Sequence, residues 1–261
     1  MDNIIDLDRY RLNQPRSTAW SALVADCRVR LANDGLFNLP GFIRPEALDK
    51  AVVELRPILA SSAFTHARKH NIYFKKSIEG IEASHPALRE FETTNRTICA
   101  DQMDQSLIIQ LYEWDAFARF LAAVMDKPKL FTMDDPLARV NVMGYSDGQA
   151  LNWHFDRSEF TTTLLLHAPS QGGDFEYDKD LRSDTDPNYE GVADLLEGRR
   201  APVRMSLDPG TLNVFKGKNT AHRVTPVAGD QDRTIAVFSY YEQPGVMFTQ
   251  EERIGFYGRA S

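Results

Sequence analysis

The stretch LARVNVMGYSDGQALNWHFDRSEFTTTLLL, residues 137–166, decides the fold class of this chain. Residues 137–145, 151–156 and 161–166 are short runs rich in apolar and β-branched side chains, which is typical of strands. Ser146-Asp147-Gly148 separates the first two runs and predicts a tight turn. The segment therefore predicts three β-strands in quick succession.

The alternation of short strands and turns continues to about residue 241. Gln171-Gly172-Gly173 is a second turn, and a short helix is expected at about 192–196. Further strands are expected at 174–177, 203–207, 212–215, 222–227 and 234–241. Many short strands separated by such turns predict a double-sheet jelly roll, or double-stranded β-helix, over residues 131–261.

The first 130 residues have a different and mainly helical pattern. Residues 17–33 place apolar side chains at helical spacing and are stopped by Asp34-Gly35. Pro45 opens a second helix, to about residue 60, and one or two more helices are expected over 98–125. We therefore expect an α+β fold in one domain, 1–261, whose helical half, 1–130, packs outside the jelly-roll core as support and lid.

Composition and charge narrow the class of protein. The 261 residues are 43% hydrophobic and 26% charged, which is enough apolar side chain to build a core. The formal net charge of −7 argues against a general nucleic-acid binder. Only two cysteines are present, Cys27 and Cys99, and no apolar run approaches the ~20 residues that a membrane span needs. We expect a cytoplasmic protein with neither a membrane nor a nucleic-acid partner.

His154-Phe155-Asp156 is the first candidate for chemistry. Residues i and i+2 of a strand point to the same side, so the imidazole and the carboxylate project together. With one distant histidine, such as His222, they form the facial triad of non-haem iron(II) enzymes. Alone the pair is a weak signal, because 6 histidines and 37 acidic residues in this chain give roughly one His-x-acid match by chance.

Arg233 strengthens the metal hypothesis. It follows His222 by 11 residues, and a short hairpin between them would put the two side chains on neighbouring strands. An arginine in that place can form a bidentate pair with a carboxylate held a few ångströms from the metal. The three residues His154, Asp156 and His222 are therefore the predicted metal ligands and catalytic residues, and Arg233 is the predicted partner of a bound carboxylate.

The pattern of His-x-Asp, a distant histidine and an arginine about ten residues later resembles the iron(II)/2-oxoglutarate oxygenase superfamily, over about residues 137–245. A closer resemblance, to the free-amino-acid radical halogenases such as lysine chlorinases, is carried by residues 5–10, 135–137, 153–156, 222–227 and 256–259. The resemblance implies iron(II), 2-oxoglutarate and O2 as cofactors. It also implies that Arg233 binds the far carboxylate of 2-oxoglutarate. Asn141, on the strand before the metal motif, is a second candidate contact, or else a satisfied strand-edge amide.

Asp156 distinguishes this chain from those halogenases, which have a small residue in its place so that chloride can bind the iron. Its presence implies a hydroxylase of an unactivated C–H bond in a small substrate, with a free amino acid expected. Two alternatives stay open: an oxygenase acting on a protein side chain or a nucleotide, and a non-catalytic, cupin-like binding protein.

Four further residues are candidate substrate contacts. Arg68, His70 and Asn71 lie in one polar segment, which is either a lid that clamps a substrate carboxylate or a solvated helix end. Asp135 could hold a substrate ammonium group, although Asp-Asp-Pro is also typical of a simple turn.

Overall fold

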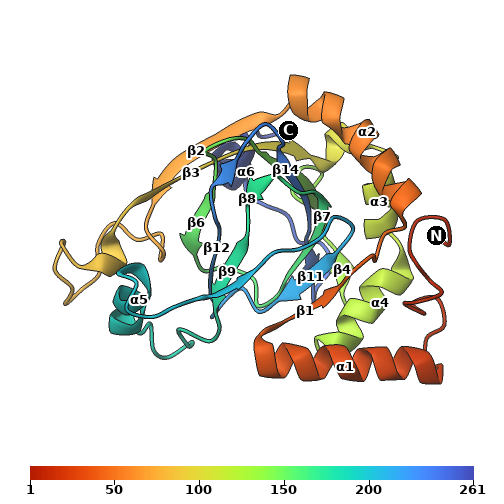
Figure 1. The fold of residues 1–261 in the computed structure, drawn as a ribbon, viewed down its shortest axis with the longest axis horizontal. Coiled ribbons are helices and arrows are strands. Elements are labelled where there is room, and N and C mark those ends of the chain that lie inside the picture. Colours follow the sequence, from red (N-terminus) through yellow and green to blue (C-terminus); the bar gives the residue numbers. More distant parts are fainter.

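Two antiparallel β-sheets face each other and enclose the centre of the molecule (Figure 1). The computed structural model describes all residues, 1–261. The larger sheet has the order β1-β11-β7-β14-β5-β3-β2 and the smaller has the order β10-β9-β12-β6. The sheets pack directly on each other where Leu36 and Phe215 of the larger meet Phe175 and Tyr177 of the smaller. This double-sheet core is the architecture expected for residues 131–261.

The strands of the larger sheet are β1 (Leu36–Leu39), β2 (Phe64–His70), β3 (Phe91–Cys99), β5 (Val140–Tyr145), β7 (Thr161–His167), β11 (Leu212–Phe215) and β14 (Arg233–Phe238). Those of the smaller are β6 (Leu151–His154), β9 (Phe175–Asp178), β10 (Val203–Met205) and β12 (Ala221–Val224). Two short pairs complete the strands: β8 (Gln171–Gly172) with β13 (Val227–Ala228), and β4 (Phe131–Thr132) with β15 (Tyr240–Tyr241).

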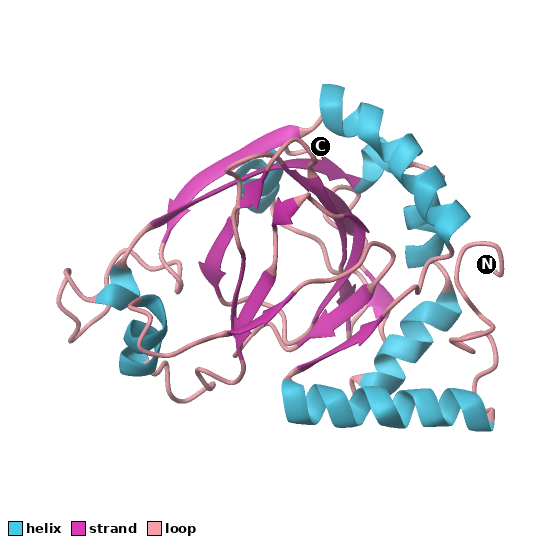
Figure 2. Ribbon diagram, viewed as in Figure 1, coloured by secondary structure: helices cyan, strands magenta, loops and turns pink.

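Most helices lie outside the sheets (Figure 2), but the last one packs on the inner face of the larger sheet, where its Tyr257 donates a hydrogen bond to Asn141. The helices are α1 (Thr18–Asp34), α2 (Pro45–Ser61), α3 (Leu107–Tyr112), α4 (Asp115–Val124), α5 (Tyr189–Leu196) and α6 (Gln250–Tyr257), with 3-10 turns at Pro86–Leu88 and Ala100–Met103. The first helix begins where Ser17 accepts a hydrogen bond from the Trp20 N–H and ends at Gly35, whose φ is +78°. No helix is both long and apolar enough to cross a bilayer.

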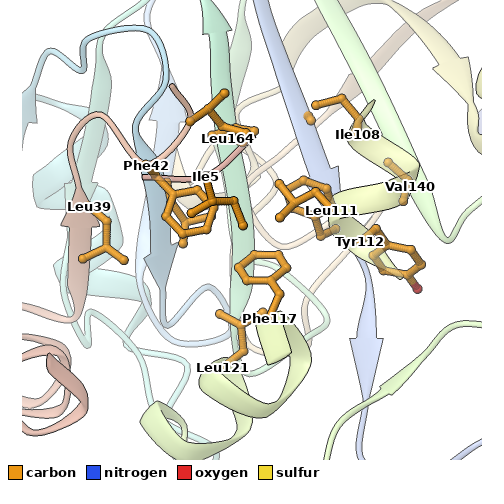
Figure 3. Close-up of a cluster of buried hydrophobic side chains, with 14 of the residues drawn as sticks. Ile5, Leu39, Phe42, Ile108, Leu111, Tyr112, Phe117, Leu121, Val140 and Leu164 are labelled. Atoms are coloured by element: carbon orange, nitrogen blue, oxygen red, sulfur yellow. The ribbon is translucent and has the colours of Figure 1, made fainter. Parts of the chain in front are cut away.

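Alternation along the strands gives the larger sheet two different faces. Val140, Leu164 and Ala236 point outward into a cluster of 39 buried residues that also includes side chains from α1 to α4 (Figure 3). Burying each large aliphatic side chain contributes roughly 1.5–3 kcal/mol, so this outer face anchors the helices. The inner face carries polar side chains, among them Asn141, Thr163, Asn213 and Arg233. The same face also carries the apolar side chains of Tyr145, Leu165 and Ile235, so the space between the two sheets has both a polar and an apolar lining.

The smaller sheet buries its outer face separately. Trp153 and Phe155 point away from the interior and pack with Ile72, Tyr73 and residues of α5 in a second cluster. Because residues alternate along β6 and beyond it, His154 and Asp156 point the other way, toward the interior.

Two expectations from the sequence are wrong. The first 130 residues are not only helical support, because β1, β2 and β3 belong to the larger sheet, and the expected helix over 98–125 begins with the last residues of β3. The strands β2 and β3 read FTHARKH and FETTNRTIC. Their inner-facing residues are polar, so they lack the alternation that would have marked them as strands.

The second error concerns the link between His222 and Arg233. The expected hairpin does not form, since β12 lies in the smaller sheet and β14 in the larger. Between them the chain pairs as β13 with β8 and crosses from one sheet to the other. The two side chains therefore approach the interior from opposite walls.

Candidate metal centre

His154, Asp156 and His222 come together in the interior. His154 ends β6 and lies directly opposite His222 of β12 in the strand register. The Asp156 carboxylate is 3.4 Å from the Nε2 atom of each histidine, through Oδ1 to His154 and Oδ2 to His222. One potential ligand atom from each residue lies within 4.8 Å of the others. Two imidazoles and one carboxylate on one side of a centre match the donor set of an octahedral metal with open positions.

Backbone carbonyls orient both imidazoles. The Nδ1 atom of His154 is 2.8 Å from the Asn152 oxygen, and that of His222 is 3.0 Å from the Thr220 oxygen. A carbonyl can only accept, so each Nδ1 carries a proton and each Nε2 is directed at the centre. Ligand histidines are commonly held in this way, which fixes the ring orientation and makes the nitrogen a better donor.

The Asp156 carboxylate sits in a cradle built by two other residues. The Thr161 hydroxyl donates a hydrogen bond of 2.5 Å to Oδ2, and the Asp156 N–H donates to the Gly217 oxygen at 3.0 Å. A Cβ atom placed on Gly217 would be 2.1 Å from Oδ2, closer than any real contact. Only glycine at 217 leaves room for the carboxylate in this position.

The charges of the three residues are strongly coupled. Burial by itself would raise the pKa of Asp156, but the neighbouring His222 and His154 hold that pKa well below its ordinary value. Burial would lower the pKa of His222, yet attraction to Asp156 outweighs burial and raises it. The pKa of His154 is lowered by burial and by the charge of His222. A divalent cation would take the place of the His222 proton beside the carboxylate.

Arg233 reaches the same interior from β14 and is 3% exposed. Its Nε donates to the Gly173 oxygen at 3.1 Å, but its Nη1 is buried without a partner. The side chain lines a cavity of about 230 Å³, together with Leu165 and Phe175. An unpaired guanidinium nitrogen in a buried site is costly unless an acceptor reaches it, so the residues present fit a carboxylate ligand.

Two predicted contacts are already engaged with the chain itself. The Asn141 amide donates to the Leu137 oxygen at 3.0 Å and accepts from the Tyr257 hydroxyl at 2.9 Å. Asp135 is fully buried, and its carboxylate accepts four hydrogen bonds, from Leu137, Ala138, Phe248 and Arg253. Both residues tie the C-terminal segment to the start of β5, and Asp135 offers no free oxygen to a substrate ammonium group.

The three other predicted contacts lie together at the edge of the centre. Arg68 extends over the Phe74 ring at 4.4 Å and makes no ion pair with an acidic side chain. His70 stacks on the same ring, and burial lowers its pKa to about 4, so the imidazole is neutral near pH 7. Asn71 uses its amide to close the turn that carries Phe74. Of the three, only Arg68 has a free charge.

Thr161, Gly217 and Phe74 were not identified from the sequence. Thr161 follows Asp156 by five residues and Gly217 precedes His222 by five, and neither spacing belongs to a motif. Phe74 follows directly on the predicted segment of Arg68, His70 and Asn71, but an aromatic residue there reads as ordinary packing. Their roles depend on contacts between elements that are distant in the sequence.

Three solved structures illustrate the fold that this chain shares. A 2OG-Fe(II) oxygenase-family oxidoreductase from Burkholderia pseudomallei is 17% identical, with 85% of this chain and 92% of that chain covered and a TM-score of 0.51. The epimerase SnoN from nogalamycin biosynthesis, in complex with Fe3+, α-ketoglutarate and nogalamycin RO, is 16% identical, with 84% of each chain covered and a TM-score of 0.56. A prolyl-4-hydroxylase from Pseudomonas putida is 14% identical, with 83% of this chain and 98% of that chain covered and a TM-score of 0.52. At such low identity these matches show the jelly-roll fold and no more.

No curated protein matches the chain significantly. A family model does: that of HalD, described as halogenase D, matches residues 20–250 and thus most of the chain. The predicted resemblance to a halogenase-like branch is confirmed by this match. The protein belongs to the halogenase D family.

Proposed function

We propose that this protein is an iron(II)- and 2-oxoglutarate-dependent hydroxylase that acts on an unactivated C–H bond of a free amino acid. The observation that carries the proposal is the placement of His154, Asp156 and His222 on one wall of the interior and the unpaired Arg233 Nη1 on the other. Three of the structures that share this fold have names that mention 2-oxoglutarate oxygenase, α-ketoglutarate or hydroxylase activity, which supports the same chemistry here.

Each residue of the centre has a definite task in this proposal. His154, Asp156 and His222 would hold the iron, and Arg233 would pair with the far carboxylate of 2-oxoglutarate. Iron(II) with 2-oxoglutarate and O2 supplies an oxidant that hydroxylates a C–H bond while 2-oxoglutarate becomes succinate and CO2. The chain itself contributes position: it presents one C–H bond to the centre and keeps water away.

Asp156 favours hydroxylation, even though the family is described as a halogenase. A halide would need the coordination position that this carboxylate fills. The hydrogen bond from Thr161 and the close approach of Gly217 hold the carboxylate there. Without a vacant position, hydroxyl transfer is the outcome that the site supports best.

Arg68 is the proposed partner of the substrate carboxylate. Its guanidinium is half-buried, lies on the Phe74 ring and has no acidic partner. The Phe74 ring is in turn 6.3 Å from the His154 ring. Burial and the nearby charge of Arg157 lower the pKa of Arg68, which an anionic ligand would reverse.

The proposal is tested with iron(II)-loaded protein, 2-oxoglutarate, O2 and a panel of the protein amino acids. We expect succinate and a product heavier by one oxygen atom, and neither with His222→Ala. Succinate without an amino-acid product would point to the alternative substrates, which peptides and nucleosides added to the panel would reveal. If His154→Ala left iron affinity unchanged, the cupin-like, non-catalytic alternative would gain, because the proposed site would not be the metal site.

The choice of hydroxylation is tested with Asp156→Gly in the presence of chloride. We expect the variant to lose hydroxylation, because the iron loses one protein ligand. Any chlorinated product would be recognised by its isotope pattern. Undiminished hydroxylation by this variant would show that Asp156 is not an essential ligand.

A further inference from the structure

Phe74 has a backbone conformation that its residue type rarely adopts. Its φ is +55°, in the left-handed region that glycine and asparagine tolerate and bulky side chains avoid. The side chain is nevertheless 45% exposed, so burial of the ring does not compensate for the strain. A strained backbone conformation that no core packing compensates indicates a functional constraint.

A turn closed by Asn71 imposes this conformation. The Asn71 Oδ1 accepts hydrogen bonds from the N–H groups of Tyr73 and Lys75, at 3.2 and 3.1 Å, and its Nδ2 donates to the Lys75 oxygen. The Phe74 N–H donates to the Asn71 oxygen at 3.0 Å. These hydrogen bonds hold Tyr73 and Lys75, the residues on both sides of Phe74, so Phe74 occupies the apex of the turn.

The turn places the Phe74 ring at the edge of the metal centre. The ring stacks on His70, with centroids 4.6 Å apart and an interplanar angle of 22°. The Arg68 guanidinium lies 4.4 Å from its centroid, and the His154 ring meets it edge-on at 6.3 Å. The ring is thus bounded by a free cation, a neutral imidazole and a predicted metal ligand.

The position of the ring is coupled to that of the ligand His154. The Nε2 of His70 is 2.8 Å from the Thr93 hydroxyl, which also accepts the Asn152 N–H at 3.1 Å. The Asn152 carbonyl is the group that orients His154. The hydrogen bond between Asn152 and Thr93 therefore links the residue that stacks on the Phe74 ring, His70, to the residue that orients His154.

We propose that Phe74 is a specificity-determining residue, whose ring forms the wall against which the aliphatic part of the substrate packs while Arg68 holds its carboxylate. This inference rests on the proposed function and adds the substrate class: an acid with an apolar segment next to its carboxylate end. Aliphatic contact with the ring positions one C–H bond at the centre, and a ring lost or misplaced leaves that bond badly aligned.

The test compares Phe74→Ala with the unaltered protein, using the amino acid of the panel that is turned over fastest. We expect KM to rise about tenfold or more, as for a lost apolar contact in a pocket, and more succinate to form per hydroxylated product. Binding of Mn(II) and 2-oxoglutarate should stay within about twofold, because Phe74 is not proposed to touch either. Phe131→Ala is the matched control, since Phe131 is also half-exposed and carries a cation, Lys129, 4.4 Å from its ring, but lies outside the site.

A second measurement, the melting temperature, separates function from packing. Phe74→Gly removes the strain, so it should melt at or above the temperature of the unaltered protein and above Phe74→Ala. Unchanged KM and coupling in Phe74→Ala, or a melting temperature of Phe74→Gly as low as that of Phe74→Ala, would overturn the inference. Amino-acid turnover with unchanged KM and coupling in Phe74→Ala would remove this inference alone. Succinate without amino-acid turnover, or no succinate at all from the unaltered protein, would remove the proposed function with it.

Discussion

At the scale of single residues, the centre depends on how the Asp156 carboxylate is held. Thr161 donates to one of its oxygens, and Gly217 provides both a backbone acceptor and the space that a Cβ would fill. Neither residue would touch the metal. They hold the carboxylate beside the two imidazoles, and a ligand that is not oriented binds a metal less well.

Thr161→Val keeps the shape of the side chain and removes the hydroxyl that bonds Asp156. We expect the affinity for Mn(II) to fall about tenfold, as for other groups that orient a metal ligand. Calorimetric titration of Mn(II) into both proteins measures the effect. Thr162→Val is the control, because Thr162 is buried on the opposite face of the same strand. Equal Mn(II) affinity in the two variants would show that the Thr161 hydroxyl does not orient Asp156.

At the scale of elements, helix α6 is tied to the core through Asp135. The Asp135 Oδ2 accepts from the Phe248 N–H and the Arg253 Nε, at 2.9 and 2.8 Å, while Oδ1 caps the turn before β5. Burial alone would raise the pKa of Asp135, but the hydrogen bonds from Ala138 and Arg253 outweigh burial and lower it. A residue expected to contact substrate therefore serves as the anchor of the C-terminal helix.

Asp135→Asn should lower the free energy of unfolding by about 3 kcal/mol near pH 7, because the partly buried Arg253 loses its counter-charge and two donors meet an amide N–H2. Urea denaturation measures the difference, and exposed Asp134→Asn is the control. The folded pKa of Asp135 is lowered, so its stabilisation is complete above the unfolded value, near 3.8, and is lost as pH falls through the folded value. The difference in free energy of unfolding between the unaltered protein and Asp135→Asn should therefore disappear in acid. A difference that is independent of pH would contradict an ionised Asp135.

At the scale of the whole molecule, the site is divided between two walls. The three predicted metal ligands project from the smaller sheet and the segment after it, and Arg233 projects from the larger. A ligand that binds residues of both walls would add to the stability of the folded state, because it binds only when the two walls are assembled.

Mn(II) and 2-oxoglutarate together should raise the melting temperature. A ligand at about 100 times its Kd adds about 2.7 kcal/mol, which corresponds to roughly 5–10 °C for a domain of this size. Arg233→Met should keep the increment from Mn(II) and lose that from 2-oxoglutarate. Arg223→Met is the control, because Arg223 pairs with Glu176 on the outer face of the smaller sheet. A 2-oxoglutarate increment that survives in Arg233→Met would place the carboxylate elsewhere.

Much of the architecture follows from the sequence alone. Helices α1 and α2 begin and end within about one residue of their expected limits, because Ser17, Gly35 and Pro45 act on the adjacent backbone. Strands β5, β6, β7 and β11 also lie where apolar runs and turns predict them. The His-x-Asp pair points to one side of its strand for a local reason, the two-residue repeat of a β-strand.

Only the tertiary structure assigned β2 and β3 to the larger sheet, placed Arg233 opposite the metal ligands and brought Thr161, Gly217 and Phe74 to them. The physical reason is that polar side chains surround the predicted metal centre. Strands β2 and β3 turn mostly polar residues toward it, and contacts across the interior join residues that no local spacing connects. Hydrophobic periodicity in a sequence shows which residues are buried against a hydrophobic core. The residues around this centre are buried against each other, so periodicity does not identify them.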